Sequence, residues 1–171
     1  GKIVLHGKEV KFSNASEAFS KGIALVPENR KLEGLYSQQS VKFNATIEVL
    51  KQFLHGAKYD KTKETEITQK YIDMMNTKTP SQNQVIRNLS GGNQQKVMIG
   101  RWLATEPDIL ILDEPTRGVD VGAKAEIYSI MNELAKNGLS IIMISSELPE
   151  IINMSDRVYV MAAGKVTGVL N

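Results

Sequence analysis

The chain has 171 residues, of which 42% are hydrophobic and 23% charged, and this composition excludes an intrinsically disordered protein. Lysines and arginines exceed aspartates and glutamates by 21 to 19, and a net charge of +2 is too small for binding to nucleic acid or an acidic membrane by charge alone. Cysteine is absent, which excludes disulfides and thiol nucleophiles and fits a reducing compartment, and no apolar run approaches the roughly 20 residues of a membrane-spanning helix.

The first 34 residues predict short elements and one buried strand. Residues 1–12 have the pattern of a hairpin, with strands at 3–5 and 10–12 and a turn at Gly7. A short helix is expected at 16–21, ended by Gly22. The apolar run 23–26 predicts a buried strand that stops at Pro27, and 28–34 predicts a polar loop.

The rest of the chain predicts helices first and then an alternating pattern. Apolar residues recur at helical spacing between 42 and 79, interrupted by a charged, solvated break at 58–63. Beyond Asn88 the prediction is a helix from Ser90 to about Leu103, strands at 109–112, 140–144 and 158–161, and helices near 122–136 and 148–153. Near-continuous apolar strands between helices predict an α/β fold with a mostly parallel sheet covered on both faces.

Two carboxylates follow directly after the apolar run 109–112. In parallel α/β sheets, ligands bind outside the carboxyl ends of the strands. This predicts that Asp113 holds Mg²⁺, which prefers few carboxylates and keeps its water, and that Glu114 orients an attacking water. The alternative is a strand that ends in a solvated acidic turn.

A Ser-Gly-Gly sequence stands at the start of the helix predicted from Ser90. Ser90 is a good N-cap, and Gly91 and Gly92 allow close approach to the backbone with free N–H groups. A helix N-terminus of this kind binds anions. The alternative is an ordinary capped helix after a glycine turn.

Three weaker signals lie at the same predicted edge of the sheet. Asp120 follows the acidic strand end, although it could act only as a helix N-cap. Ser146 follows the strand at 140–144, where a capped helix start is the alternative. Glu28 follows the strand at 23–26, where a simple loop acid is equally compatible with the sequence.

In this order the elements resemble the ATP-binding domain of ABC transporters. Residues 89–94, Leu-Ser-Gly-Gly-Asn-Gln, resemble the family's signature, and 109–114 resemble its Walker B motif. Asp120 falls at the D-loop position, Glu28 at the Q-loop position, and 42–103 at the helical subdomain. A finer resemblance is to the second of two fused ATP-binding domains in bacterial sugar importers. The runs 5–10 and 100–104 resemble the galactose/methyl-galactoside branch, and ribose and xylose relatives share much of the pattern.

The resemblance implies a part of a P-loop NTPase domain, with 1–34 as N-terminal strands and Q-loop region, 35–104 as helical subdomain and signature helix, and 105–171 as the Walker B, D-loop and switch core. It implies ATP and Mg²⁺ as cofactors. Its site residues would be Glu114, Asp120 and Ser146 in catalysis, Asp113 at the metal, and Ser90, Gly91, Gly92, Gln94 and Glu28 at the nucleotide.

The resemblance also implies partners and a location. These are the first ABC domain of the same polypeptide, membrane permease subunits and, indirectly, a sugar-binding protein, with no nucleic acid. The location would be cytoplasmic, on the inner face of the cell membrane. Two alternatives stay open, a soluble ABC-type ATPase that acts on ribosomes or DNA and a degenerate domain that supplies only an interaction surface.

The sequence departs from the family pattern at three places. No Gly-x-x-x-x-Gly-Lys-[Ser/Thr] run is present, so we expect a fragment that begins after the P-loop and binds ATP poorly alone. Ser146 stands where most members carry His, and Glu28 where Gln is usual. A seryl hydroxyl cannot act as a cation toward a phosphate. The resemblance implies a second domain that is often catalytically degenerate, so we expect this domain's own site to hydrolyse ATP slowly.

Overall fold

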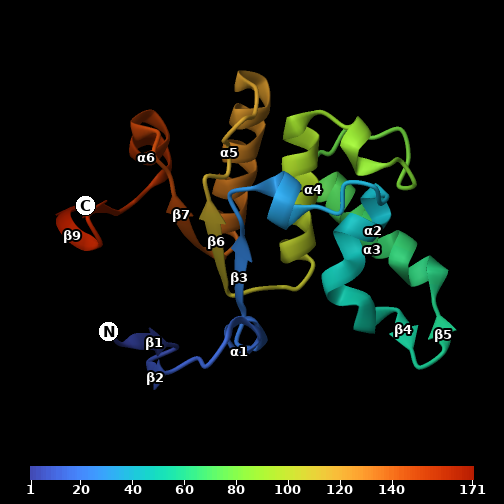
Figure 1. Ribbon diagram of the computed structural model, residues 1–171, viewed down its shortest axis with the longest axis horizontal. Coiled ribbons are helices and arrows are strands. Elements are labelled where there is room, and N and C mark those ends of the chain that lie inside the picture. Colours follow the sequence, from blue (N-terminus) through green and yellow to red (C-terminus); the bar gives the residue numbers. More distant parts are fainter.

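The computed structural model describes residues 1–171, and a short parallel sheet lies near its middle (Figure 1). The sheet has the order β3-β6-β7, from β3 (Ile23–Val26), β6 (Ile109–Asp113) and β7 (Ser140–Ile144). Ile23 pairs with Ile109, and Ile109 with Ser140. The three apolar runs that were predicted as strands beside the candidate site therefore lie side by side, which confirms the parallel α/β prediction for this part of the chain.

One face of the sheet is covered and the other is open. The covered face packs against α4 (Gly91–Leu103) and α5 (Val121–Lys136), and its buried side chains are Ala24, Val26, Leu110 and Leu112. On the opposite face, Leu25, Ile142 and Ile144 are 48%, 52% and 48% exposed. The prediction that helices cover both faces is thus wrong for this chain, because α4 and α5 both lie on the same side.

A helical segment is inserted between the neighbouring strands β3 and β6. It contains α2 (Val41–Thr46), a 3-10 helix η2 (Ile47–Gln52), α3 (Lys61–Met74) and a short turn η3 (Ile86–Asn88). Helix α4 contacts α2 and α3 as well as β3 and α5, so it lies between this segment and the sheet (Figure 1). The predicted helical character of 42–79 is confirmed, but a small hairpin interrupts it.

That hairpin leads into the expected charged break at 58–63, whose residues are exposed as predicted, although the next helix already begins at Lys61. Strands β4 (Leu54–His55) and β5 (Lys58–Tyr59) pair around a turn at Gly56, and Asp60 then caps α3 by accepting from the N–H of Lys63 at 2.9 Å. Turn and capping chemistry account for the break, since an aspartate one residue after the hairpin can start a new helix.

Two other local predictions need correction, and a third is confirmed. The first hairpin pairs β1 (Ile3–Leu5) with β2 (Lys8–Val10) rather than with 10–12, because its two-residue turn has positive φ at His6 and Gly7. The expected loop at 28–34 contains a π-helical turn, η1 (Arg30–Gly34), capped by the Asn29 side chain. The predicted short helix is confirmed as α1 (Ala15–Ser20).

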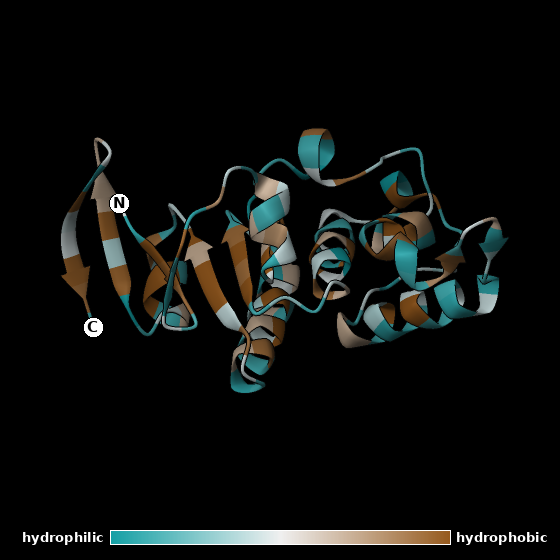
Figure 2. Ribbon diagram, turned by 90° about the horizontal axis from the view of Figure 1, so that it is seen from below, coloured by the Kyte–Doolittle hydropathy of each residue, from teal (hydrophilic) through white to brown (hydrophobic).

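The C-terminal strand lies outside the parallel sheet. Strand β8 (Val158–Ala162) pairs antiparallel with β9 (Lys165–Leu170), which the sequence reading missed. Ala163 and Gly164 between them both have positive φ, as a tight hairpin turn requires, so the pairing is local. This hairpin and both termini lie at the end of the molecule away from the helical segment (Figure 2). None of the helices combines the length and apolar character that crossing a bilayer requires.

A buried arginine joins α4 to the helical segment. The Arg101 guanidinium donates to the Asn44 backbone oxygen at 2.6 Å and to its Oδ1 at 2.8 Å. Asn44 is completely buried, and its side chain also bonds the backbone of Tyr36 and Ser40. Burial lowers the pKa of Arg101 from its ordinary value, while Glu48 and Tyr36 act in the opposite direction. The hydrogen bonds that Asn44 accepts from Arg101 thus offset the desolvation cost of burying this charge.

This pairing predicts a large effect of a small side-chain truncation. We expect Asn44→Ala to lower the free energy of unfolding by about 2–3 kcal/mol, because Arg101 and the Tyr36 backbone would lose buried partners. Urea denaturation followed by circular dichroism measures the change. The exposed Asn83→Ala is the control, and equal midpoints for the two variants would contradict the assignment.

Candidate functional site

The carboxyl ends of β6 and β7 bring three of the predicted residues to one edge. Asp113 is the last residue of β6 and pairs with Ile144, the last residue of β7. Glu114 follows with a φ of 46°, and its N–H donates to the Ile144 oxygen at 2.9 Å. Its Oε1 accepts from the N–H of Ser146, also at 2.9 Å. The structure therefore places Glu114 in contact with Ser146 and beside Asp113.

Asp113 is a candidate metal ligand that does not belong to a cluster of ligating side chains. The chain has no group of three or more His, Asp or Glu side chains that could hold a metal ion. Mg²⁺ fits such a place, since it is commonly held by one or two carboxylates with water and substrate phosphates. The two histidines are elsewhere, because His6 contacts Asp108 at the opposite end of β6 and His55 lies in β4.

A buried glutamate that the sequence analysis missed supports this edge. Glu150 lies in the first turn of α6 (Leu148–Met154), accepts from Thr116 Oγ1 at 3.0 Å and also bonds Ser145 Oγ. It connects α6 to the chain segments that leave β6 and β7. The available signal was its position in the first turn of a helix, where a carboxylate is favoured by the helix dipole.

The Ser-Gly-Gly run begins α4 as predicted. Ser90 is the N-cap, and its Oγ accepts from the Asn93 N–H at 3.4 Å and from Asn93 Nδ2 at 2.9 Å. The first amides of a helix have no partner within it, so those of Gly91 and Gly92 are available to an anion. The Gln94 side chain instead donates to the Leu89 oxygen at 2.9 Å, which supports the loop from within.

Gly92 is also required by packing. A Cβ added there would lie 2.4 Å from the Cβ of Ala123 in α5. The starts of α4 and α5 therefore touch through a glycine and an alanine. The same contact fixes the position of Asp120, which caps α5 by accepting from the Ala123 N–H at 3.0 Å. The capping role considered for Asp120 is confirmed, and its carboxylate stays exposed.

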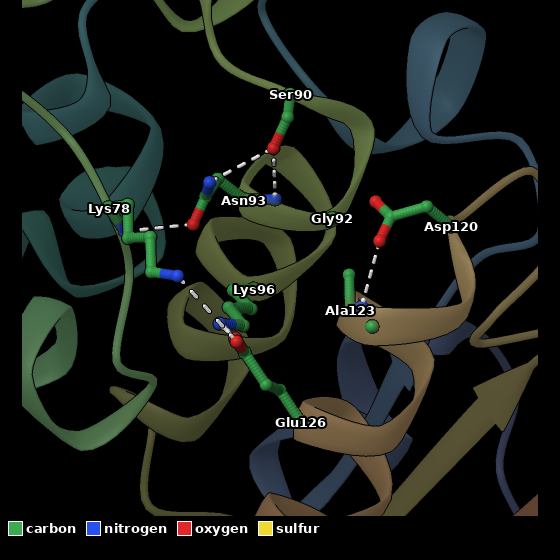
Figure 3. A pocket seen from close by; sticks show the side chains of 9 residues that line it. Lys78, Ser90, Gly92, Asn93, Lys96, Asp120, Ala123 and Glu126 are labelled. Carbon is green, nitrogen blue, oxygen red and sulfur yellow. Dashed lines mark hydrogen bonds and ion pairs between the residues drawn. The ribbon is translucent and has the colours of Figure 1, made fainter.

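Ser90 and Asp120 line one pocket with a volume of about 280 Å³. Figure 3 shows them at the starts of α4 and α5, with Lys96 and Glu126 meeting between the two helices. Neither Asp113 nor Glu114 lines this pocket. The predicted site residues thus form two separate groups, one at the start of α4 and one at the strand ends.

An ion pair lines the pocket. Lys96 is almost fully buried, donates to the Asn76 oxygen at 3.0 Å and pairs with Glu126. The hydrogen bond and charge of Lys96 lower the pKa of Glu126 from its ordinary value. Because a buried ammonium without a partner is costly, this pair holds α4 and α5 at a fixed separation.

The carboxylate of Glu28, which was predicted to contact the nucleotide, is paired with another side chain of the protein. This partner is Arg117, in the segment between β6 and α5. Nearby, the Arg30 side chain donates to the backbone oxygens of Arg117 and Gly118, a contact that the sequence analysis missed. No local pattern signals it, because the partners are backbone atoms far along the chain.

The close contact of α4 and α5 yields a stability prediction. We expect Gly92→Ala to lower the free energy of unfolding by about 1–3 kcal/mol, because the new methyl would overlap the Ala123 side chain. Gly122→Ala is the matched control, since its Cβ would meet only Asp120 at 3.4 Å and alanine favours a helix. Thermal denaturation compares them, and a tolerated Gly92→Ala would contradict the packing role.

The Lys96–Glu126 pair predicts a pH effect. A carboxyl whose folded pKa is lowered stabilises the fold above its unfolded pKa, and this contribution disappears as the pH falls through the folded pKa. We therefore expect the stability difference between wild type and Glu126→Gln to shrink as the pH falls below about 4.5. Denaturation at a series of pH values measures it, with Glu133→Gln, which breaks an exposed pair with Lys136, as control. A constant difference across this range would refute the prediction.

Comparisons with known proteins agree with this arrangement. The model of the ABC transporter family matches residues 1–117. The chain is 54% identical over 171 residues to the galactose/methyl galactoside import ATP-binding protein MglA of Haemophilus influenzae, covering 99% of this chain and 34% of that protein. It is 48% identical over 167 residues to the ribose import ATP-binding protein RbsA of Rhodopirellula baltica, covering 98% and 33%. The chain thus spans about a third of the length of these curated relatives.

Solved structures show the same fold. A dimeric ATP-binding cassette in a post-hydrolysis state, bound to ADP and Pi, superposes with a TM-score of 0.80 at 18% identity, over 99% of this chain and 72% of that one. A nucleotide-free cassette from an ABC transporter gives 0.81 at 22% identity, over 99% and 68%. With the family model matching more than half of its residues, the chain belongs to the ABC transporter family.

Proposed function

We propose that this chain is part of the ATP-hydrolysing subunit of a bacterial sugar importer, with galactose or a methyl galactoside as the transported sugar. The curated relatives that match the whole chain support this assignment, because they are import ATP-binding proteins and the galactose/methyl galactoside type recurs among them. In this proposal the chain is one of two ATP-binding domains in one polypeptide, attached to the inner face of the membrane through permease subunits.

The separation of the site residues into two groups carries the mechanistic proposal. Two ABC domains that enclose ATP head to tail each contribute a signature loop to one site and an acidic strand end to the other. Ser90 lines a pocket that Asp113 and Glu114 do not reach, as this division of roles requires. The segment from Arg117 to Asp120 follows Glu114 and ends at Asp120, which lines the same pocket as Ser90, and it would couple the two sites across the interface.

The signature group would complete the site whose P-loop belongs to the first domain. The Ser90 hydroxyl is at the N-terminus of a well-formed helix of 13 residues, and the amides of Gly91 and Gly92 have no intrahelical partners. Such a terminus favours a phosphate through both hydrogen bonds and the helix dipole. Gln94 would act from behind by holding the loop through the Leu89 oxygen.

The acidic group would belong to this domain's own site. Asp113 would hold Mg²⁺ together with water and phosphate oxygens, and the ion would supply charge neutralisation there. Glu114 would orient the attacking water, but its Oε1 is bonded to the Ser146 amide, and Ser146 supplies no positive charge. Glu28 pairs with Arg117, which directs it away from a free role at the phosphates. These features support slow ATP hydrolysis at this domain's own site.

The permease would contact the surface formed by the loop after β3 and the helical segment. Leu32 in η1 is 82% exposed and Tyr36 is 53% exposed, although both side chains are large and apolar. Exposed apolar groups beside a polar rim are typical of protein–protein contacts. The same loop contacts the segment before Asp120, so a movement of the permease would reach the ATP-binding groups.

Two substitutions in the proposed two-domain polypeptide test the division of roles. We expect Ser90→Arg to lower the steady-state rate of ATP hydrolysis by about 100-fold, because the long arginine side chain would fill the phosphate position at the start of α4. Glu114→Gln should lower it by less than about tenfold if this domain's own site is slow, whereas a working general base contributes about 100-fold or more.

The control is Ser129→Arg, at an exposed serine of α5, which should retain the wild-type rate. An equal, near-total loss in Glu114→Gln would overturn the slow-site assignment. A wild-type rate in Ser90→Arg would overturn the signature role. If permease-containing vesicles with the galactose-type binding protein take up no galactose or methyl galactoside, the sugar assignment fails.

A further inference from the structure

A single guanidinium joins three backbone segments that are distant in sequence. Arg30 begins η1, in the loop after β3, and its Nη1 donates to the Arg117 oxygen at 3.0 Å. Its Nη2 donates to the Gly118 oxygen at 3.1 Å. The two acceptors are consecutive carbonyls of the turn between β6 and Asp120. The fixed fork geometry of arginine suits such a pair, whereas the lysine ammonium does not.

The same group lies against the signature loop. A Cβ added at Gly91 would be 2.9 Å from Arg30 Nη2 and 3.3 Å from the Gly118 oxygen. Gly91 therefore leaves the space that the guanidinium occupies. The start of α4, the turn before Asp120 and η1 meet at this position.

The base of Arg30 is itself fixed. Asn29 caps η1 through its side chain at 3.2 Å from the Leu32 N–H. At the other end of the turn, a Cβ on Gly34 would overlap Met98 of α4, so η1 rests directly on that helix. Arg30 Nε is buried without a hydrogen-bond partner, and the residue as a whole is half-buried. Hydrogen bonds from a charged donor are stronger than neutral ones.

A second contact runs in parallel with the first. Glu28, two residues before Arg30, pairs with the Arg117 side chain, while Arg30 holds the Arg117 backbone. Glu28 can be lost from this pair by rotation of one exposed side chain. Arg30 holds main-chain oxygens, so it restrains the path of the turn itself.

We propose that Arg30 is a positioning residue that fixes the signature loop and the turn before Asp120 relative to each other and to the loop after β3. Through it, Ser90 and Asp120 move as one unit with η1. The role in ATP hydrolysis rests on the proposed function, whereas the structural link is a property of this chain alone.

The link is tested first in the chain itself. We expect Arg30→Gln to speed amide hydrogen exchange in peptides covering 88–93 and 114–122, and to leave the α3 peptide covering 61–74 unchanged. We also expect the fall in Tm caused by Gly91→Ala to be smaller when Arg30 is replaced by Ala, because the new methyl would no longer meet the guanidinium. Additive losses in Tm, or faster exchange throughout the chain, would overturn the link.

The role in hydrolysis is tested in the two-domain polypeptide. We expect Arg30→Gln to lower kcat about tenfold with little change in KM for ATP, since the loss of a charged hydrogen-bond pair would affect alignment more than nucleotide binding. Arg30→Lys should recover only part of the rate, and the neighbouring Lys31→Gln, also on η1, should retain it. Wild-type kcat in Arg30→Gln would overturn the positioning role. A wild-type polypeptide without ATPase activity would refute the proposed function but leave the exchange result to decide the link.

Discussion

Burial of α4 on nearly every side is the constraint on which the rest of the structure depends. The helix is enclosed by the sheet, α5 and the helical segment, and its buried residues include three that are polar or charged: Gln95, Lys96 and Arg101. Burying charged groups in such a place is costly unless they have partners. Asn44 meets this need for Arg101, and Glu126 with the Asn76 carbonyl meets it for Lys96. These partners fix the helix in rotation as well as in position.

The candidate site takes its geometry from this fixed helix. The position of Ser90 is set by α4, whose buried side chains prevent the helix from rotating about its axis. The position of Asp120 depends on Gly92, because this glycine lets α5 approach α4 at Ala123. The glycines of the signature therefore have two functions, one toward an anion and one toward neighbouring chain segments. At the other edge, Glu114 and Ser146 depend on the register of β6 against β7, which apolar side chains determine.

The sequence predicted what local chemistry determines. The helix caps at Ser90 and Asp120, the strand predicted at 109–112 and the edge shared by Glu114 and Ser146 follow from capping residues and apolar runs. The structure confirms them and extends the strand by one residue, to Asp113. The π-helical turn at Arg30 and the β8–β9 pairing were missed, since a polar run has no clear period and the turn at Ala163 carries a weak signal. Arg30 and Glu150 were missed because their partners lie far along the chain.

The pairing of β3 with β6 has a consequence for how the chain folds. Ile23 and Ile109 are neighbours in the sheet, but the entire helical segment separates them in sequence. Joining two strands across a long disordered loop has an entropic cost, and a compact insert shortens the effective loop. We therefore expect the helical segment and α4 to collapse before β3 pairs with β6, which would make the start of α4 an early product of folding and the β3–β6 pairing a late one.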